Sequence, residues 1–173
     1  FIEKPFAALV EEETGQRCVN FGCLNAGIDV FARDPYVPGA AAAAMITVVQ
    51  VMGAQNMSNR FYSVHPRRND RFLAPSDLLK TIFREIDFSE FHFNKHLLTT
   101  LRKVSPDRFD AIYTELQAAW VTRMRLLVKQ MHGKVILLWF ADHHPAEDIL
   151  PLSGLGDDPL FVTRGMIAEV APY

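Results

Sequence analysis

Cysteine and excess charge are both scarce in this sequence of 173 residues. The two cysteines, Cys18 and Cys23, have no second pair at the spacing of a zinc site, which disfavours a metal site built on them. We expect Cys18 to be a small buried side chain in a strand. The formal net charge is -2, which disfavours broad electrostatic binding of nucleic acid or of an anionic membrane.

Long hydrophobic runs are also missing. The longest, Ala40 to Val49, begins with alanines and is too short to span a bilayer. The first residues, FIEKPF, lack both the pattern of a signal peptide and an initiator methionine. We therefore expect a cytoplasmic protein without a membrane partner, whose natural N-terminus lies upstream of Phe1.

The spacing of apolar residues predicts helices that alternate with strands. Ser105 followed by Pro106 is the strongest helix start in the chain. Two apolar runs are continuous rather than alternating, which is typical of strands buried on both faces of a parallel sheet. The expected strands are 17–22, 45–52 and 134–140, and the expected helices are 5–14, one between 24 and 44, 76–86, 89–103, 105–133 and 161–170.

This order of elements predicts an α/β fold. Strands that alternate with helices imply right-handed crossovers and a doubly wound sheet. We expect one three-layer domain over residues 1–173, with a mainly parallel sheet and a helical insertion at 76–104. The polar connection 53–75 is long enough to be functional or mobile.

Polar side chains gather where the three predicted strands end. The segments are NFGCLNAGID after the first strand, GAQNMSN after the second and ADHH after the third. Because ligands of open parallel sheets bind beyond the carboxyl ends of the strands, we expect these segments to meet at one site. The candidate ligand-binding residues are Asn25, Asn59, Arg60, Asp142 and His143.

Two of these segments carry a resemblance to a known family. A strand ending in NxGxxxxG, then a strand ending in glycine plus an amide, is similar to the second and third blocks of the SGNH, or GDSL-like, hydrolases. Their fold is flavodoxin-like. The chain also resembles an uncharacterised alphaproteobacterial domain family in the phrases NFGCLNAG, VVQVMGAQNMSNR and LLWFADH.

The first resemblance implies an ester hydrolase or acyltransferase that acts on a small-molecule or carbohydrate ester without a cofactor. By analogy, the oxyanion would be held by the backbone N–H of Gly27 and by the side-chain amide of Gln55 or Asn56, which are the candidate catalytic residues. Here GAQN stands in place of GxND, and the GDS-like block of the nucleophile and the DxxH block of the base are missing. The chain would then be truncated at both ends.

Other interpretations of these residues remain open. A non-catalytic domain of the same fold would use its amides to hold a ligand or a partner. The amides would alternatively satisfy backbone groups of a tight loop. Ser58 is a further candidate nucleophile, without a GxSxG elbow around it.

The charged segments have alternatives of their own. Asp142 with His143 or His144 would form an acid–base pair, or a metal site joined by His65 or His92. The arginines of HPRRNDR, residues 65–71, would bind an anion such as phosphate or sit in a solvated loop.

Overall fold

The computed structural model describes residues 4–147 and 154–171, which form a mixed α/β structure. The broad α/β class is as predicted, but three helices precede the first strand. The elements are α1 (Phe6–Thr14), α2 (Ile28–Arg33), α3 (Val37–Ala43), β1 (Ile46–Gln50), β2 (Tyr62–Val64), β3 (Phe72–Pro75), α4 (Asp77–Ile82), the 3-10 turn η1 (Phe88–Glu90), α5 (Asn94–Val104), α6 (Pro106–Val128), β4 (Lys134–Leu138) and α7 (Arg164–Val170).

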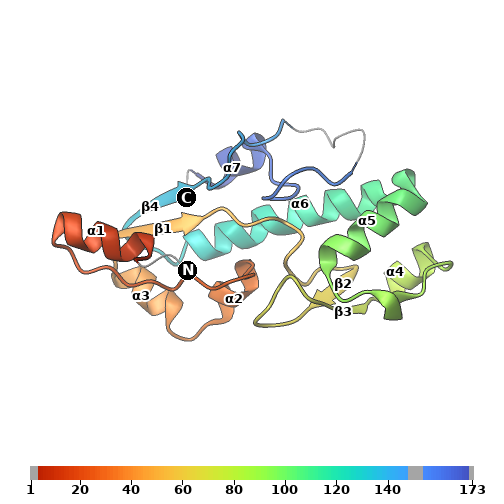
Figure 1. Ribbon diagram of the computed structural model, residues 1–173, viewed down its shortest axis with the longest axis horizontal. Helices are drawn as coiled ribbons and strands as arrows, with labels where there is room; N and C mark the ends of the chain where they lie inside the picture. The colour runs from red at the N-terminus through yellow and green to blue at the C-terminus, as the bar shows by residue number, and fades with distance from the viewer. Residues whose placement is uncertain (1–3, 148–153, 172–173) are drawn as a thin grey trace.

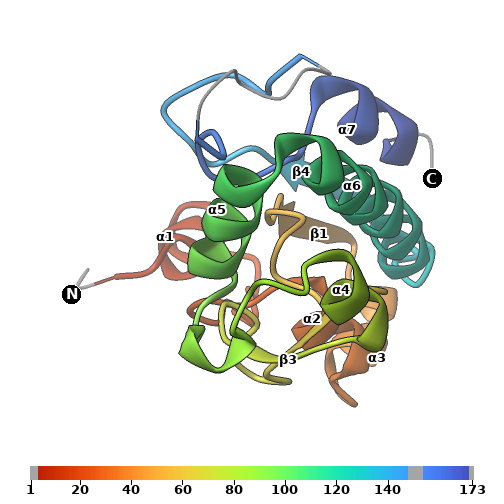
Figure 2. The same ribbon diagram turned by 90° about the vertical axis from the view of Figure 1, so that its right-hand side faces the viewer.

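The long helix α6 organises the core. It begins at the predicted point, where the Ser105 hydroxyl accepts the N–H of Arg108 at 3.4 Å. Figure 1 shows α6 running along the molecule beneath α7, and Figure 2 shows α5 beside α6. Its buried residues include Phe109, Ile112, Leu116, Trp120, Met124, Leu127 and Val128.

The strands form two sheets of two strands each in the described part of the chain. β1 and β4 pair in parallel, from Ile46 beside Lys134 to Gln50 beside Leu138. β2 and β3 form an antiparallel pair within the polar connection 53–75, where no strand was predicted. The strands predicted at 45–52 and 134–140 therefore pair with each other. In the described residues they do not form part of a wide, doubly wound sheet.

The predicted strand 17–22 is not formed. The N–H of Cys18 is bonded to the carboxylate of Glu11 at 2.6 Å, and the side-chain oxygen of Asn20 accepts the N–H of Gly22 at 2.8 Å. Val19 and Phe21 are exposed, and Cys18 is only half-buried. Aromatic and β-branched residues favour an extended backbone, but a strand also needs a neighbour with which to exchange hydrogen bonds.

Burial of β1 and β4 also differs from the prediction. Val49 is buried, whereas Ile46, Val48 and Ile136 are exposed. The sheet is therefore covered on one face along much of its length. A continuous apolar run predicts a strand, but it does not by itself determine whether other elements cover both faces of the sheet.

The two helices predicted to begin at Ser76 and Ser89 differ in how well their start was predicted. Ser76, where a helix was predicted to begin, caps α4 by accepting the N–H of Leu79 at 3.2 Å. Ser89 does not cap the next helix, because its own N–H and hydroxyl bond to Asp87 inside η1. The helix α5 begins five residues later, at Asn94. No helix in the described part of the chain is long and apolar enough to cross a membrane.

Candidate functional site

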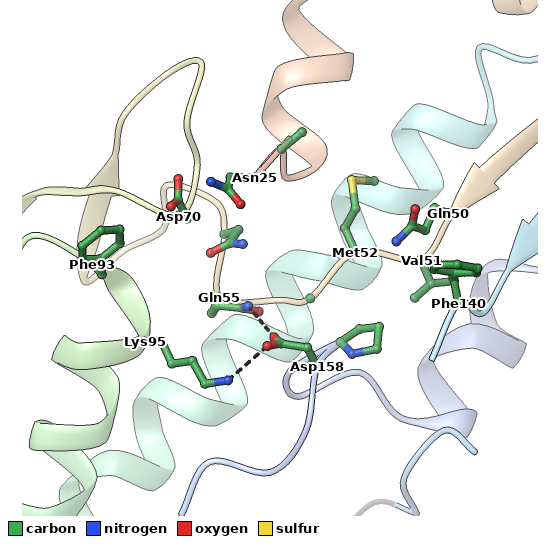
Figure 3. A pocket seen from close by; sticks show the side chains of 14 residues that line it. Asn25, Gln50, Val51, Met52, Gln55, Asp70, Phe93, Lys95, Phe140 and Asp158 are labelled. Atoms are coloured by element: carbon green, nitrogen blue, oxygen red, sulfur yellow. Dashed lines mark hydrogen bonds and ion pairs between the residues drawn. The ribbon is translucent and has the colours of Figure 1, made fainter. Parts of the chain in front are cut away.

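A cavity of about 470 Å³ opens beyond the carboxyl end of β1 (Figure 3). Three of the predicted site residues, Asn25, Gln55 and Asn56, line it. Asn25 has a positive φ of 58°, a conformation that asparagine tolerates better than most residues. The other lining residues are Ala26, Gln50, Val51, Met52, Gly53, Asp70, Phe93, Lys95, Phe140, Asp158 and Pro159.

Hydrogen bonds from Trp120 of α6 and Tyr62 of β2 hold the loop that follows β1 in place. The indole N–H of Trp120 donates to the carbonyl oxygen of Met52 at 2.7 Å, which ties the end of the strand to α6. The hydroxyl of Tyr62 donates to the carbonyl oxygen of Gln55 at 2.7 Å. Burial raises the pKa of Tyr62 well above its usual range, so the phenol stays protonated and keeps this hydrogen bond.

Gln55 and Lys95 both bind the carboxylate of Asp158. The amide of Gln55 donates to one oxygen at 3.1 Å, and the ammonium of Lys95 lies 3.0 Å from the other. Figure 3 shows these two contacts in the middle of the cavity wall. Asp158 is 103 residues from Gln55 in sequence, and no local pattern connects them.

A buried asparagine that we did not predict joins three parts of the site. The side-chain amide of Asn94 donates to the carbonyl oxygens of Gln55 and Asn69, at 3.2 and 2.6 Å, and to the side chain of Asn56 at 3.2 Å. The start of α5 is thereby bonded to the loop after β1 and to the loop before β3. The signal available in the sequence was weak, because Asn94 lies among residues typical of a helix.

Gly27 contacts the same network. Its N–H donates to the side-chain oxygen of Asn69 at 3.0 Å. A side chain at Gly27 would place its first carbon 1.8 Å from the carbonyl oxygen of Asn56, so only glycine fits there. The role of Gly27 as an oxyanion donor stays a prediction, and in this structure its N–H already has an acceptor.

The remaining predicted residues do not line the cavity. Asn59 accepts the N–H groups of Phe61 and Tyr62, at 2.9 and 3.2 Å, and thus orders a tight loop. Arg60 is exposed and lies 3.6 Å from Glu115. Asp142 is also exposed.

His143 bridges two segments beside a smaller cavity of about 130 Å³. Its Nδ1 lies 2.9 Å from the carbonyl oxygen of His144, and its Nε2 lies 3.0 Å from that of Asp158. Carbonyl oxygens only accept hydrogen bonds, so both contacts are made when both ring nitrogens carry a proton. The contacts with His144 and Asp158 raise the pKa of His143 above its ordinary value. Within residues 4–147 and 154–171, no group of three His, Cys, Asp or Glu side chains is placed to hold a metal ion.

The bridge predicts a pH dependence of stability. Because the pKa of His143 is higher in the folded chain than in the unfolded chain, its contribution is complete below the unfolded pKa of about 6.5 and is lost as the pH rises through the folded pKa. We expect the melting temperature of the natural sequence to fall relative to that of His143→Gln on going from about pH 6 to pH 8. Parallel pH profiles of the two proteins, by differential scanning calorimetry, would contradict the bridge.

A family model described as "domain of unknown function (DUF6473)" matches residues 1–173. The chain belongs to this family. No curated protein and no solved structure matches it. The predicted resemblance to SGNH hydrolases is therefore wrong, because the model that spans this DUF6473 chain is a different one. Glycine and asparagine after a strand are common wherever a tight turn follows, so their spacing was a weak indicator of family.

Proposed function

We propose that the chain is a ligand-binding domain whose cavity holds a small hydroxylated molecule of carbohydrate-like chemistry. The observation that carries the proposal is the lining, which combines side-chain amides with aromatic rings. The amides are Asn25, Gln50, Gln55 and Asn56, and the rings are Phe93 and Phe140. Both rings are substantially exposed.

This combination suits hydroxyl groups better than it suits a purely ionic ligand. A hydroxyl both donates and accepts, and a carboxamide offers one acceptor and two donors in a plane. Exposed phenylalanine rings provide apolar surface for the C–H faces of a sugar ring. Convergent polar groups in a preformed hollow are the usual design of a small-molecule site. The cavity also lies beyond the carboxyl end of the parallel strand β1, which is where ligands of parallel sheets bind.

The side chains that line the cavity favour ligand binding over ester hydrolysis. Its described lining has no serine, threonine, cysteine or histidine to act as a nucleophile or a base. The hydroxyl of Ser58 accepts the N–H of Val64 at 3.1 Å, away from the cavity. The amide of Gln55 donates to Asp158, which competes with an oxyanion for it.

Gln50 offers the sharpest test, because it lines the cavity and its side chain is exposed. We expect neutral hexoses, titrated into the protein and followed by NMR of the side-chain amides, to give saturable shifts. Gln50→Ala should weaken binding by about three- to tenfold, since one hydrogen bond contributes about 0.5–1.5 kcal/mol. Gln130→Ala, which lies outside the cavity, is the matched control and should bind normally.

Two results would count against this function. The first is the absence of saturable shifts with any neutral hexose. The second is a covalent adduct with a fluorophosphonate on the folded protein, because a binding domain without a nucleophile forms none. The adduct would instead support the predicted ester hydrolase.

A further inference from the structure

The smaller cavity, of about 130 Å³, has walls of its own next to the proposed ligand site. Chain neighbours divide between the two cavities at two places. Trp139 lines the smaller cavity and Phe140 the larger, and Asp157 lines the smaller and Asp158 the larger. Pro159 contributes to both. The two cavities therefore lie beside the same two segments but present different side chains to their contents.

Apolar and aromatic side chains form most of the walls of the smaller cavity. Leu155, Phe161 and Val162, which line it, are all buried. Tyr113, on α6, packs edge-on against the ring of Phe161, with 5.4 Å between the ring centroids and 89° between the ring planes. These buried walls offer a water molecule few hydrogen-bond partners, so an apolar group can replace water there at little loss.

The backbone of Phe161 adopts an unusual conformation to place its ring in this wall. Among the described residues, Asn25 and Phe161 are the two other than glycine with a positive φ, and each lines one of the two cavities. A φ of 66° is unfavourable for a residue as bulky as phenylalanine. Gln117 holds it there by donating to the carbonyl oxygen of Phe161 at 3.1 Å. Residues held in this way are concentrated at functional sites.

His143 adds a positive charge to the lining. Its two ring nitrogens face the carbonyl oxygens of His144 and Asp158, so the ring that makes both contacts is an imidazolium. Its plane stands at 85° to that of Trp139, with 5.6 Å between the ring centroids. A cation attracts the π face of an aromatic ring, and it has no such attraction for a saturated ring of the same size.

We infer that the smaller cavity is a second binding site, which takes one uncharged aromatic ring of the size of benzene. An apolar cavity of about 150 Å³ is known to bind benzene, and the volume here is similar. The aromatic rings of the wall provide edge-to-face partners for such a ring. This site does not depend on the function proposed for the larger cavity, because different side chains form it.

The two tryptophans of the chain provide one reporter for each cavity. The indole N–H of Trp139, which lines the smaller cavity, donates to the carbonyl oxygen of His143 at 2.6 Å. The indole N–H of Trp120 donates to the carbonyl oxygen of Met52, a residue that lines the larger cavity. In an NMR titration, benzyl alcohol should shift the Trp139 signal saturably and leave the Trp120 signal nearly unchanged.

Cyclohexylmethanol has the same hydroxymethyl group on a saturated ring. It should bind about two- to tenfold more weakly than benzyl alcohol, because it lacks the contacts between aromatic rings and the attraction of the imidazolium. Equal or tighter binding of cyclohexylmethanol would overturn the assignment to an aromatic ring.

Ala146→Leu tests where the ring binds. Ala146 lines the smaller cavity and is exposed, so a larger side chain there reduces the cavity without entering the buried core. This variant should bind benzyl alcohol about tenfold more weakly or not at all. Ala111→Leu, at an exposed position of α6 outside both cavities, is the matched control and should bind normally. An unchanged Trp120 signal shows that each variant is folded.

The outcomes separate this inference from the proposed function. A Trp139 signal that does not respond to benzyl alcohol overturns the second site. Undiminished binding by Ala146→Leu overturns its location. A neutral hexose that shifts the Trp120 signal, in a protein that fails to bind benzyl alcohol, leaves the function of the larger cavity intact. Binding of benzyl alcohol without binding of any hexose does the reverse.

Discussion

Replacing Arg123 with methionine is expected to lower the free energy of unfolding by about 3 kcal/mol. The guanidinium of Arg123, on α6, lies 2.7 Å from the carboxylate of Asp29, on α2. It also donates to the carbonyl oxygen of Ser58, whose N–H donates to the same carboxylate at 3.3 Å. Because the side chain of Asp29 is only 7% exposed, removing Arg123 leaves a buried charge poorly compensated.

Arg33 provides a control within the same site. It contacts the same carboxylate at 3.6 Å, but its side chain is 65% exposed. Arg33→Met should therefore cost less than about 1 kcal/mol. Urea denaturation followed by tryptophan fluorescence measures both variants, because the buried Trp120 lies on the same helix as Arg123. If both variants lose the same free energy of unfolding, the ion pair between Arg123 and Asp29 does not stabilise the fold more than the exposed pair of Arg33 does.

Gly27→Ala should have the second large effect, a loss of about 3 kcal/mol or a comparable rearrangement of the loop after β1. The new methyl group would lie 1.8 Å from the carbonyl oxygen of Asn56, and this neighbour is backbone, which cannot rotate away. The same carbon would also fall 3.0 Å from the side-chain oxygen of Asn69, which accepts the Gly27 N–H. The substitution should therefore disturb both stability and the cavity.

Gly39→Ala is the matched control for this effect. Gly39 lies within α3, and an added carbon there would meet nothing within 4 Å. Alanine is the better helix former, so this variant should be about 0.5–1 kcal/mol more stable than the natural sequence. If both alanine variants are equally stable by urea denaturation, the close approach of Gly27 to Asn56 does not exist in solution.

Local patterns in the sequence predicted the local structure well where one signal dominated. Ser105 and Pro106 marked the start of α6 because a hydroxyl cap and a proline both fit a first helical turn. The helix predicted at 5–14 ends as expected, and Gly15 after it takes the left-handed conformation that glycine adopts readily. Prediction was wrong for the strand at 17–22, since strand formation depends on a partner that local composition does not specify.

The candidate site was predicted only in its central segment. Gln55 and Asn56 belong to the polar cluster expected after the strand at 45–52, and Asn25 comes from the segment after the predicted strand 17–22, which is not formed; all three line the cavity. Asp70, Lys95 and Asp158 were not among the predicted residues. They come from a loop, from the start of a helix and from a segment near the C-terminus, and each looks in sequence like an ordinary surface charge.

The sequence by itself determined where α6 and the two parallel strands form, because helix and strand periodicity depend on residues a few positions apart. Only the tertiary structure decided which side chains surround the cavity. Gln55 meets Asp158 across 103 residues, and Asn94 meets the carbonyl oxygen of Gln55 across 39. Such contacts depend on how α5, α6 and the loops pack, and this packing follows from the sum of many weak interactions that no short motif records.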